Sequence, residues 1–235
     1  MIPLSSLDKV GVEVDLPTSW RGLTDAQLHY VAELASSNNF SNDEIKALLI
    51  TRTARLSKST IKQLSGYSYV EAMNVLEWMD TPPTEPICFD RLDGHQAVRL
   101  NLYGVPFSHY LEIENYYQGY LQTQNRLALQ AICTILYPGF VRNTLTAAEQ
   151  YAVLLWLVGL KALYVHMFPY LFSSSNTEGG EPVDPREVMN AEMRALTGGD
   201  ITKTKAVLEA DTLTALTELD AKAREAEFVR RSMKE

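Results

Sequence analysis

The chain has 235 residues, of which 46% are hydrophobic and 21% are charged, and its formal net charge at pH 7 is −8. This is enough apolar sequence for one folded body with a core, so a disordered chain is excluded. The acidic balance argues against a generally basic nucleic-acid surface, because phosphate binding depends on clustered Lys and Arg. We therefore expect a protein partner rather than nucleic acid.

The N-terminal residues lack the basic start and apolar core of a signal peptide, and we expect residues 1–16 to form an extended arm. The only two cysteines, Cys88 and Cys133, stand among apolar neighbours. That setting favours buried free thiols over a disulfide framework. These features predict a protein of the reducing cytoplasm.

Repeated capping patterns predict the helices. A Ser, Thr or Asp followed three residues later by Glu or Gln can satisfy exposed backbone donors in both directions. Each of five such patterns directly precedes an apolar run, which predicts a mainly α fold, a helical bundle with its body at residues 17–172. The pairs are Thr24 with Gln27, Ser41 with Glu44, Ser68 with Glu71, Thr146 with Glu149, and Asp184 with Glu187.

One region interrupts the helical pattern. Residues 80–109 contain four prolines and the tight-turn sequence "LDGH". We expect a β-hairpin insertion at about 86–106 that turns at Asp93-Gly94, with strands in "PICF" and "AVRLNLYG".

Two long apolar stretches follow. Apolar and aromatic residues recur at helical spacing from Leu111 to Leu136, and Gly119 and the polar "QTQN" are expected to bend or split that helix. The stretch from residue 152 to residue 172 is long enough to span a bilayer, but Lys161 lies at its centre. We therefore expect it to be the central buried helix of the bundle and not a membrane span.

The end of the chain predicts a helical arm. Residues 173–184 have the composition of a flexible linker, and residues 185–235 follow as two helices. Gly198-Gly199 is expected to stop the first helix, and Asp200 to cap a second helix that runs to about Arg231. A narrow apolar stripe on this second helix needs a partner, which is its own body, a second copy, or another protein's groove. The stripe contains Leu208, Leu216, Leu219, Ala223 and Ala226.

No catalytic pattern stands out. His109 and Glu112 share a helical face, but the second such pair that a di-metal bundle site needs is missing. Cys133 has no activating base nearby in sequence, and the apolar setting raises the pKa of a thiol. "ALTGGDITK" lacks the spacing of a phosphate-binding loop, and no Gly-x-Ser-x-Gly elbow is present. We predict no enzyme, and no catalytic, cofactor-binding or metal-binding residue.

Four tyrosines offer a second candidate contact surface: Tyr116, Tyr117, Tyr120 and Tyr137. They form either a binding face or a tyrosine-rich rim of the core, and the rim is the commoner arrangement. The predicted protein-binding residues are Tyr116, Tyr117 and Tyr120, together with Leu208, Leu216, Leu219 and Ala223 of the arm.

Four segments carry a family resemblance: "LPTSWRGLTDAQL", "YYQGYLQTQNRLALQAICTILYPG", "AVLLWLVGLKALYVHMFPYLF" and "MRALTGGDITKTKAVLEADTLTALTELDAKAREAEF". Together they resemble a family of small acidic helical proteins from tail or morphogenesis gene clusters of Bacteroidetes phages and prophages. Some members are described as tail assembly chaperone-like. The segments contain packing and capping motifs, so the family supplies no active-site residues.

The resemblance implies a non-enzymatic virion assembly or accessory protein of the host cytoplasm that binds a tail component or a second copy of itself. Alternatives are a structural virion component, such as a connector or baseplate piece that stays in the particle, and a helical regulatory or nucleic-acid-associated protein.

Overall fold

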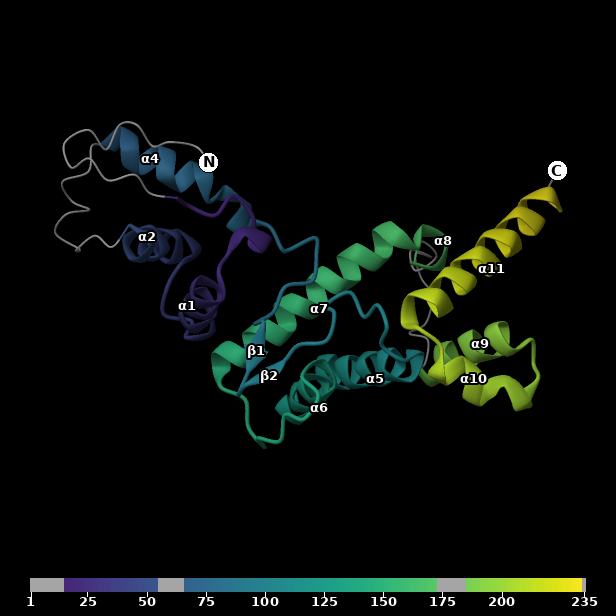
Figure 1. Cartoon of the computed structure of the whole chain (residues 1–235). Coiled ribbons are helices and arrows are strands. Elements are labelled where there is room, and N and C mark those ends of the chain that lie inside the picture. Colours follow the sequence, from purple (N-terminus) through teal and green to yellow (C-terminus); the bar gives the residue numbers. More distant parts are fainter. Residues whose placement is uncertain (1–14, 55–65, 173–184, 234–235) are drawn as a thin grey trace.

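The computed structural model describes residues 15–54, 66–172 and 185–233, which form a mainly helical protein (Figure 1). Within these residues the only sheet is a two-stranded antiparallel hairpin, so the predicted helical bundle with a small hairpin is confirmed. The predicted linker at 173–184 lies outside the described residues. So does the predicted N-terminal arm, apart from Asp15 and Leu16.

The first helices form a unit with a hydrophobic core of its own, which we call the N-terminal unit. It comprises η1 (Trp20–Gly22), α1 (Asp25–Ser36), α2 (Asn42–Thr53), α4 (Gly66–Val75) and η2 (Glu77–Asp80). Its core consists of buried apolar side chains from these helices and their flanks: Leu16, Val31, Ile45, Leu49, Ile50, Ala54, Ala72, Leu76 and Met79.

A larger core, the main core, fills the rest of the molecule, and α7 (Ala147–Met167) runs through it. The side chains of Trp156 and Leu157 are almost completely buried, so the prediction of a central helix after Thr146 is confirmed. Helix α1 joins the two cores, because Leu28 and Ala32 pack into the main core while Val31 packs into that of the N-terminal unit.

Three of the five predicted helix caps are confirmed as reciprocal capping boxes, those at Thr24, Ser41 and Thr146. The prediction at Ser68 is wrong, because α4 already begins at Gly66 and a cap residue must have a non-helical backbone. Asp184 lies outside the described residues.

The predicted hairpin turn is confirmed, with β1 (Arg91–Leu92) paired to β2 (His95–Gln96). Asp93 and Gly94 both have positive φ, 48° and 83°, which a two-residue turn of type I′ requires. The strands are shorter than predicted. "PICF" is largely buried in the main core instead of pairing as a strand, and Val98 donates its backbone N–H to the Leu136 carbonyl at 2.8 Å.

The long helical stretch after the hairpin splits into α5 (Phe107–Thr123) and α6 (Arg126–Leu136). The split falls at "QTQN", where Gln124 has a φ of 54° and the side chain of Asn125 accepts the Leu127 N–H at 3.0 Å. Gly119, the other predicted break, lies inside α5.

The C-terminal helices are α8 (Pro169–Phe172), α9 (Pro185–Thr197), η4 (Ile201–Lys203), α10 (Thr204–Glu209) and α11 (Thr212–Ser232). Both glycines after α9 have positive φ, 64° at Gly198 and 83° at Gly199, which confirms the predicted helix stop. The Asp200 side chain accepts the Thr202 N–H at 3.0 Å and caps η4, so the predicted cap at Asp200 is also confirmed.

The prediction of one continuous helix from Asp200 to Arg231 is wrong. The backbone is extended at Ala210, and the Asp211 side chain caps a new helix by accepting the Thr214 N–H at 3.0 Å. The chain opens here to pair with the segment before α5. Phe107 N donates to the Ala210 carbonyl at 2.8 Å, and Thr212 N donates to the Val105 carbonyl at 2.9 Å.

This pairing fixes the start of α11 to the body. Ala215, Leu216 and Leu219 are buried members of the main core. The Asp220 side chain accepts the backbone N–H groups of Tyr170 and Leu171, at 2.8 and 2.9 Å, and so holds α8 against α11. The predicted arm at 185–235 is therefore packed on its own body along the first half of α11.

Candidate functional site

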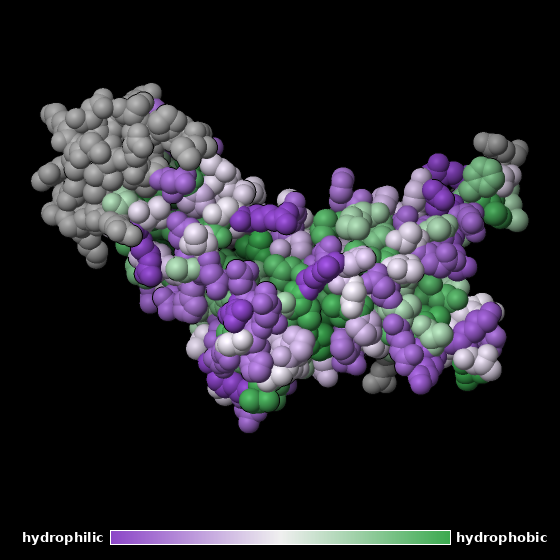
Figure 2. Space-filling view, viewed as in Figure 1, coloured by the Kyte–Doolittle hydropathy of each residue, from purple (hydrophilic) through white to green (hydrophobic). Residues whose placement is uncertain are grey.

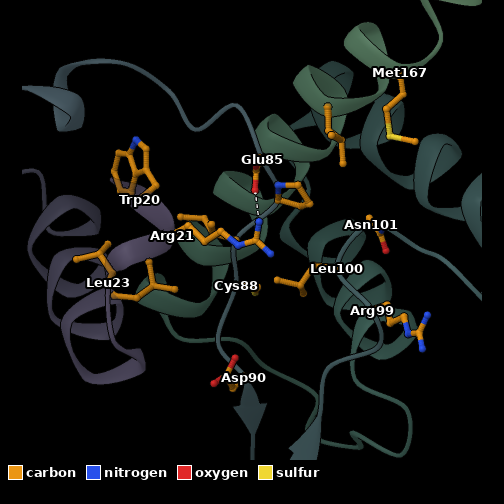
Figure 3. A pocket seen from close by; sticks show the side chains of 14 residues that line it. Trp20, Arg21, Leu23, Glu85, Cys88, Asp90, Arg99, Leu100, Asn101 and Met167 are labelled. Atoms are coloured by element: carbon orange, nitrogen blue, oxygen red, sulfur yellow. Dashed lines mark hydrogen bonds and ion pairs between the residues drawn. The ribbon is translucent and has the colours of Figure 1, made fainter. Parts of the chain in front are cut away.

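A groove of about 620 Å³ lies where the N-terminal unit meets the main body (Figure 3). Figure 2 shows hydrophobic surface, in green, in this hollow between the N-terminal helices and the rest of the molecule, with hydrophilic groups at its edges. The lining comes from η1 and α1, from residues 85–90, from residues 99–101 and from the end of α7. The lining residues are Trp20, Arg21, Leu23, Leu28, Glu85, Pro86, Ile87, Cys88, Asp90, Arg99, Leu100, Asn101, Leu163 and Met167.

One wall of the groove is the strap, residues 81–90, the irregular segment that leads from η2 to β1. Trp20 holds its beginning, because the indole N–H of Trp20 donates to the Thr81 carbonyl at 2.8 Å. The indole N–H of Trp78, just before the strap, donates to the Pro17 carbonyl at 2.9 Å. The two indole rings meet edge to face with centroids 5.1 Å apart, a favourable aromatic geometry.

The strap crosses α7 at Gly159. A Cβ atom added to Gly159 would lie 2.1 Å from the Glu85 carbonyl oxygen, a distance that no real contact allows. A glycine is needed here because the backbone of the strap lies directly against the helix. The absence of a side chain at residue 159 therefore sets the depth at which the strap forms the groove wall.

A second, smaller hollow of about 270 Å³ adjoins the groove and shares part of its lining. The shared residues are Trp20, Arg21, Glu85 and Ile87. Trp78 and two prolines line the remainder together with the hydroxyl residues Ser19, Thr81 and Thr84. The prolines make this end of the surface rigid. Together the two hollows are lined by strap residues from Thr81 to Asp90.

The charged groups of the groove are balanced. Arg21 and Glu85 form an ion pair at 2.6 Å, and both side chains are more than half exposed. The Arg99 guanidinium lies 4.6 Å from the centroid of the Tyr103 ring, and Asp90 supplies a second carboxylate. Two cations and two carboxylates leave no net charge, whereas a phosphate-binding surface needs clustered cations.

The one thiol in the groove lining is not a nucleophile. Cys88 is buried, and the hydroxyl of Tyr137 lies 3.0 Å from its sulfur while donating to the Phe89 carbonyl at 2.7 Å. Burial raises the pKa of Cys88 to about 12, so the thiol stays protonated. Burial likewise raises the pKa of Cys133 to about 12, and both cysteines are free, as predicted.

The predicted tyrosines lie on α5, away from the groove. Tyr116, Tyr117 and Tyr120 are partly buried and pack against the main core, which corresponds to the rim arrangement. The Lys161 ammonium lies 5.1 Å from the centroid of the Tyr117 ring and 2.8 Å from both carboxylate oxygens of Glu114.

The residues of the predicted apolar stripe on the arm differ in their burial. Leu216 and Leu219 are buried in the main core, so they offer no surface to another protein, which corrects their assignment as partner-binding residues. Leu208 is partly buried against the same core, and Ala223 lies beyond the buried part of α11. Deleting residues 185–235 would therefore uncover the main core.

The groove itself was not predicted from the sequence. The sequence predicts that Trp20 packs ahead of α1, and it does pack there. Its indole N–H also holds the strap, which the sequence does not indicate. The sequence contains two signals for the groove, the prolines at 82, 83 and 86 and a lone glycine in the apolar α7. Neither signal says that these elements meet.

The described residues contain no group of three His, Cys, Asp or Glu side chains placed to hold a metal ion. His109 and Glu112 lie together on α5 without a third ligand from that part of the chain.

Of the helices that the structure describes, α7 alone is long and apolar enough to cross a membrane by length and composition. The same helix forms the centre of the main core, and Lys161 near its middle is ion-paired to Glu114. The core helix of a soluble protein meets the same criteria, so this is weak evidence for a membrane span.

Comparison of the chain with protein-family models, with curated proteins and with solved structures finds no match.

Proposed function

We propose that the protein is a non-enzymatic assembly or accessory protein of a phage or prophage tail, acting in the host cytoplasm through contacts with other proteins in a chaperone-like role. The observation that carries the proposal is the groove, with its mixed polar and apolar lining, its balanced rim charges and its protonated thiol. The resemblance of four sequence segments to tail-cluster proteins supports the same role.

The composition of the groove favours an extended polypeptide as the occupant. Its volume of about 620 Å³ is in the range of binding pockets, and the partly exposed Leu23, Leu100 and Leu163 supply apolar surface for side chains. The rim arginines and carboxylates can bind the polar groups of a peptide backbone. We therefore assign the groove to an extended, apolar segment of a tail protein, such as the tail tube or the tape measure.

Met167 provides the test, because it lines the groove and is 41% exposed, so a change there does not disturb the core. The chain is co-expressed with a tail tube protein and with a tape measure protein as candidate partners, and complexes are recovered by affinity purification. The wild-type chain should retain one of them, and Met167→Glu should lose it. Val141→Glu, at an exposed residue outside the groove, is the matched control and should retain it.

Unchanged retention by Met167→Glu would remove the groove from the proposal, and failure of the wild-type chain to retain either protein would overturn the proposed role. Mass spectrometry of purified particles then separates two kinds of tail protein. A chaperone-like protein leaves before the particle is complete and should be absent. Its presence would assign the chain as a connector or baseplate component instead.

A further inference from the structure

Helix α11 has two halves with different surroundings. Its buried residues, Thr212, Ala215, Leu216 and Leu219, all lie in the first half. In the distal half, residues 221–233, no side chain is buried. Figure 1 shows this half extending away from the other helices towards the C-terminus. Most helical stability in proteins comes from the packing of one face of the helix, and the described body supplies no such packing to the distal half.

The distal half carries a short apolar stripe with the spacing of a coiled coil. Counted from the buried Leu219, positions a and d fall at Lys222, Ala226, Val229 and Met233, in alternating steps of three and four residues. The charged Lys222 pairs with Glu218, so the stripe consists of Ala226, Val229 and Met233. Val229 and Met233 are 49% and 81% exposed. The stripe continues the side of α11 that is buried in the first half, but here no described part of the body covers it.

The charged residues beside the stripe indicate which kind of helix would pack on it. Glu225 and Arg230 occupy the g and e positions that flank Ala226 and Val229. In a parallel pair of helices, a g residue faces the e residue five positions later on the other helix. Glu225 of each helix would therefore face Arg230 of the other helix, which makes two such contacts. Within the described residues neither side chain has an ion-pair partner, whereas Glu218–Lys222 and Glu227–Arg231 are paired along α11 itself.

We propose that the distal half of α11 pairs in parallel with the distal half of α11 in a second copy of the chain, as a short two-stranded coiled coil. A second copy is the occupant because the free charges are self-complementary across a twofold axis parallel to the helix, and the same patch serves both subunits. The proposal is independent of the groove and of the proposed tail role, because none of the groove residues lies on α11.

The first test is the oligomeric state of the full-length chain, measured by sedimentation equilibrium across the micromolar range. The wild-type chain should form a concentration-dependent dimer, and Val229→Asp should weaken it at least tenfold. Phe228→Asp is the matched control, because Phe228 is 73% exposed on the same helix but lies outside the a and d positions. A wild-type chain that stays monomeric overturns the proposal, as does a dimer that Val229→Asp leaves unchanged.

Charge reversal provides the second test. Glu225→Arg and Arg230→Glu each create like-charge pairs across the interface and should each weaken the dimer, whereas the double variant should restore it. A mixture of the two single variants should form a heterodimer, because each then supplies the charge that the other lacks. Arg224→Glu, on the outer face, should leave the dimer intact. If the double variant is as weak as the single variants, the parallel register is wrong.

Discussion

The N-terminal unit and the C-terminal helices are attached to the same body in different ways. The N-terminal unit has its own core and shares α1 with the main core, whereas the C-terminal helices place their buried apolar residues directly in the main core. The N-terminal unit is a separately packed unit that α1 and the strap connect to the body, whereas the C-terminal helices are part of the body. A substitution that removes a buried side chain of α11 should therefore destabilise the whole body, whereas one in α2 should destabilise only the N-terminal unit.

Leu216→Ala should have the largest effect. Leu216 is completely buried in the main core, and a Leu→Ala change at such a site costs about 2–5 kcal/mol. Because the main core is shared by α5, α6, α7 and α11, the whole body should lose this amount, seen as a lower urea midpoint by circular dichroism. Thr217→Ala, at the next and exposed residue, is the control. A loss confined to amides of α11 in hydrogen exchange would contradict the shared core.

Leu49→Ala removes the same side chain from the other core. Leu49 is also completely buried, and the local cost is in the same range, about 2–5 kcal/mol. We expect the amides of α2 and α4 to exchange faster while those of α6 and α7 keep their protection, because the main core is unchanged. Equal loss of protection in α6 and α7 would show that the two cores unfold as one.

The sequence predicts the features that depend on neighbouring residues and misses those that depend on contacts between distant residues. Capping boxes at Thr24, Ser41 and Thr146 are local, and so is the turn at Asp93-Gly94, so all four follow from neighbouring residues. The break at Ala210 depends on backbone hydrogen bonds to residues 105 and 107, about a hundred positions away. The local signal is weak: Asp211 is a preferred cap residue, but position 214 is Thr and not the Glu or Gln of a capping box. The sequence therefore predicts one continuous helix.

The groove is not predictable from the sequence because it too depends on a long-range contact. Its wall depends on the contact between Gly159 and the strap, two segments separated by more than seventy positions. A glycine in an apolar helix indicates that some backbone approaches closely, but it does not identify which one. The thiol chemistry, in contrast, was predicted, because apolar neighbours of Cys133 in sequence are also its neighbours in the core.

Gly159→Ala tests the joint between the N-terminal unit and the body. The added Cβ would meet the Glu85 carbonyl, so the strap must shift, at a cost of about 1–3 kcal/mol. The shift should change the fluorescence of Trp20, whose indole binds the start of the strap. Gly119→Ala in α5 is the matched control, because its Cβ meets no atom within 4 Å, and it should be neutral or stabilising by about 0.5–1 kcal/mol.

One carboxyl group in each region should respond to pH with opposite sign. In the N-terminal unit, the Lys46 ammonium binds Asp80 at 2.5 Å, and this hydrogen bond lowers the pKa of Asp80 despite some desolvation. The stability from this pair is present above the ordinary carboxyl pKa and is lost as the pH falls through the lowered one. Asp80→Asn should therefore cost most at neutral pH and least in acid, which urea unfolding at a series of pH values measures.

In the C-terminal helices the carboxyl group of Glu192 on α9 is in the reverse situation. Burial, and then the nearby carboxylate of Glu114, raise its pKa to about 7. The folded chain holds this proton more tightly than the unfolded chain, so stability is full below the ordinary pKa and falls as the pH rises towards 7. Glu192→Gln keeps the shape of the protonated group and removes this loss.

Glu192→Gln should therefore match the wild-type chain near pH 4.5 and exceed its stability by about 1–2 kcal/mol at pH 8, a modest gain because Glu192 keeps part of its surface in water. The same series of urea unfolding experiments measures the difference. Glu187→Gln, at an exposed residue of the same helix, is the control for the removal of one carboxylate from α9. A constant difference at every pH would mean that the gain comes from packing and not from the charge, and the carboxyl groups of the two regions would then not differ in the sign of their pH response.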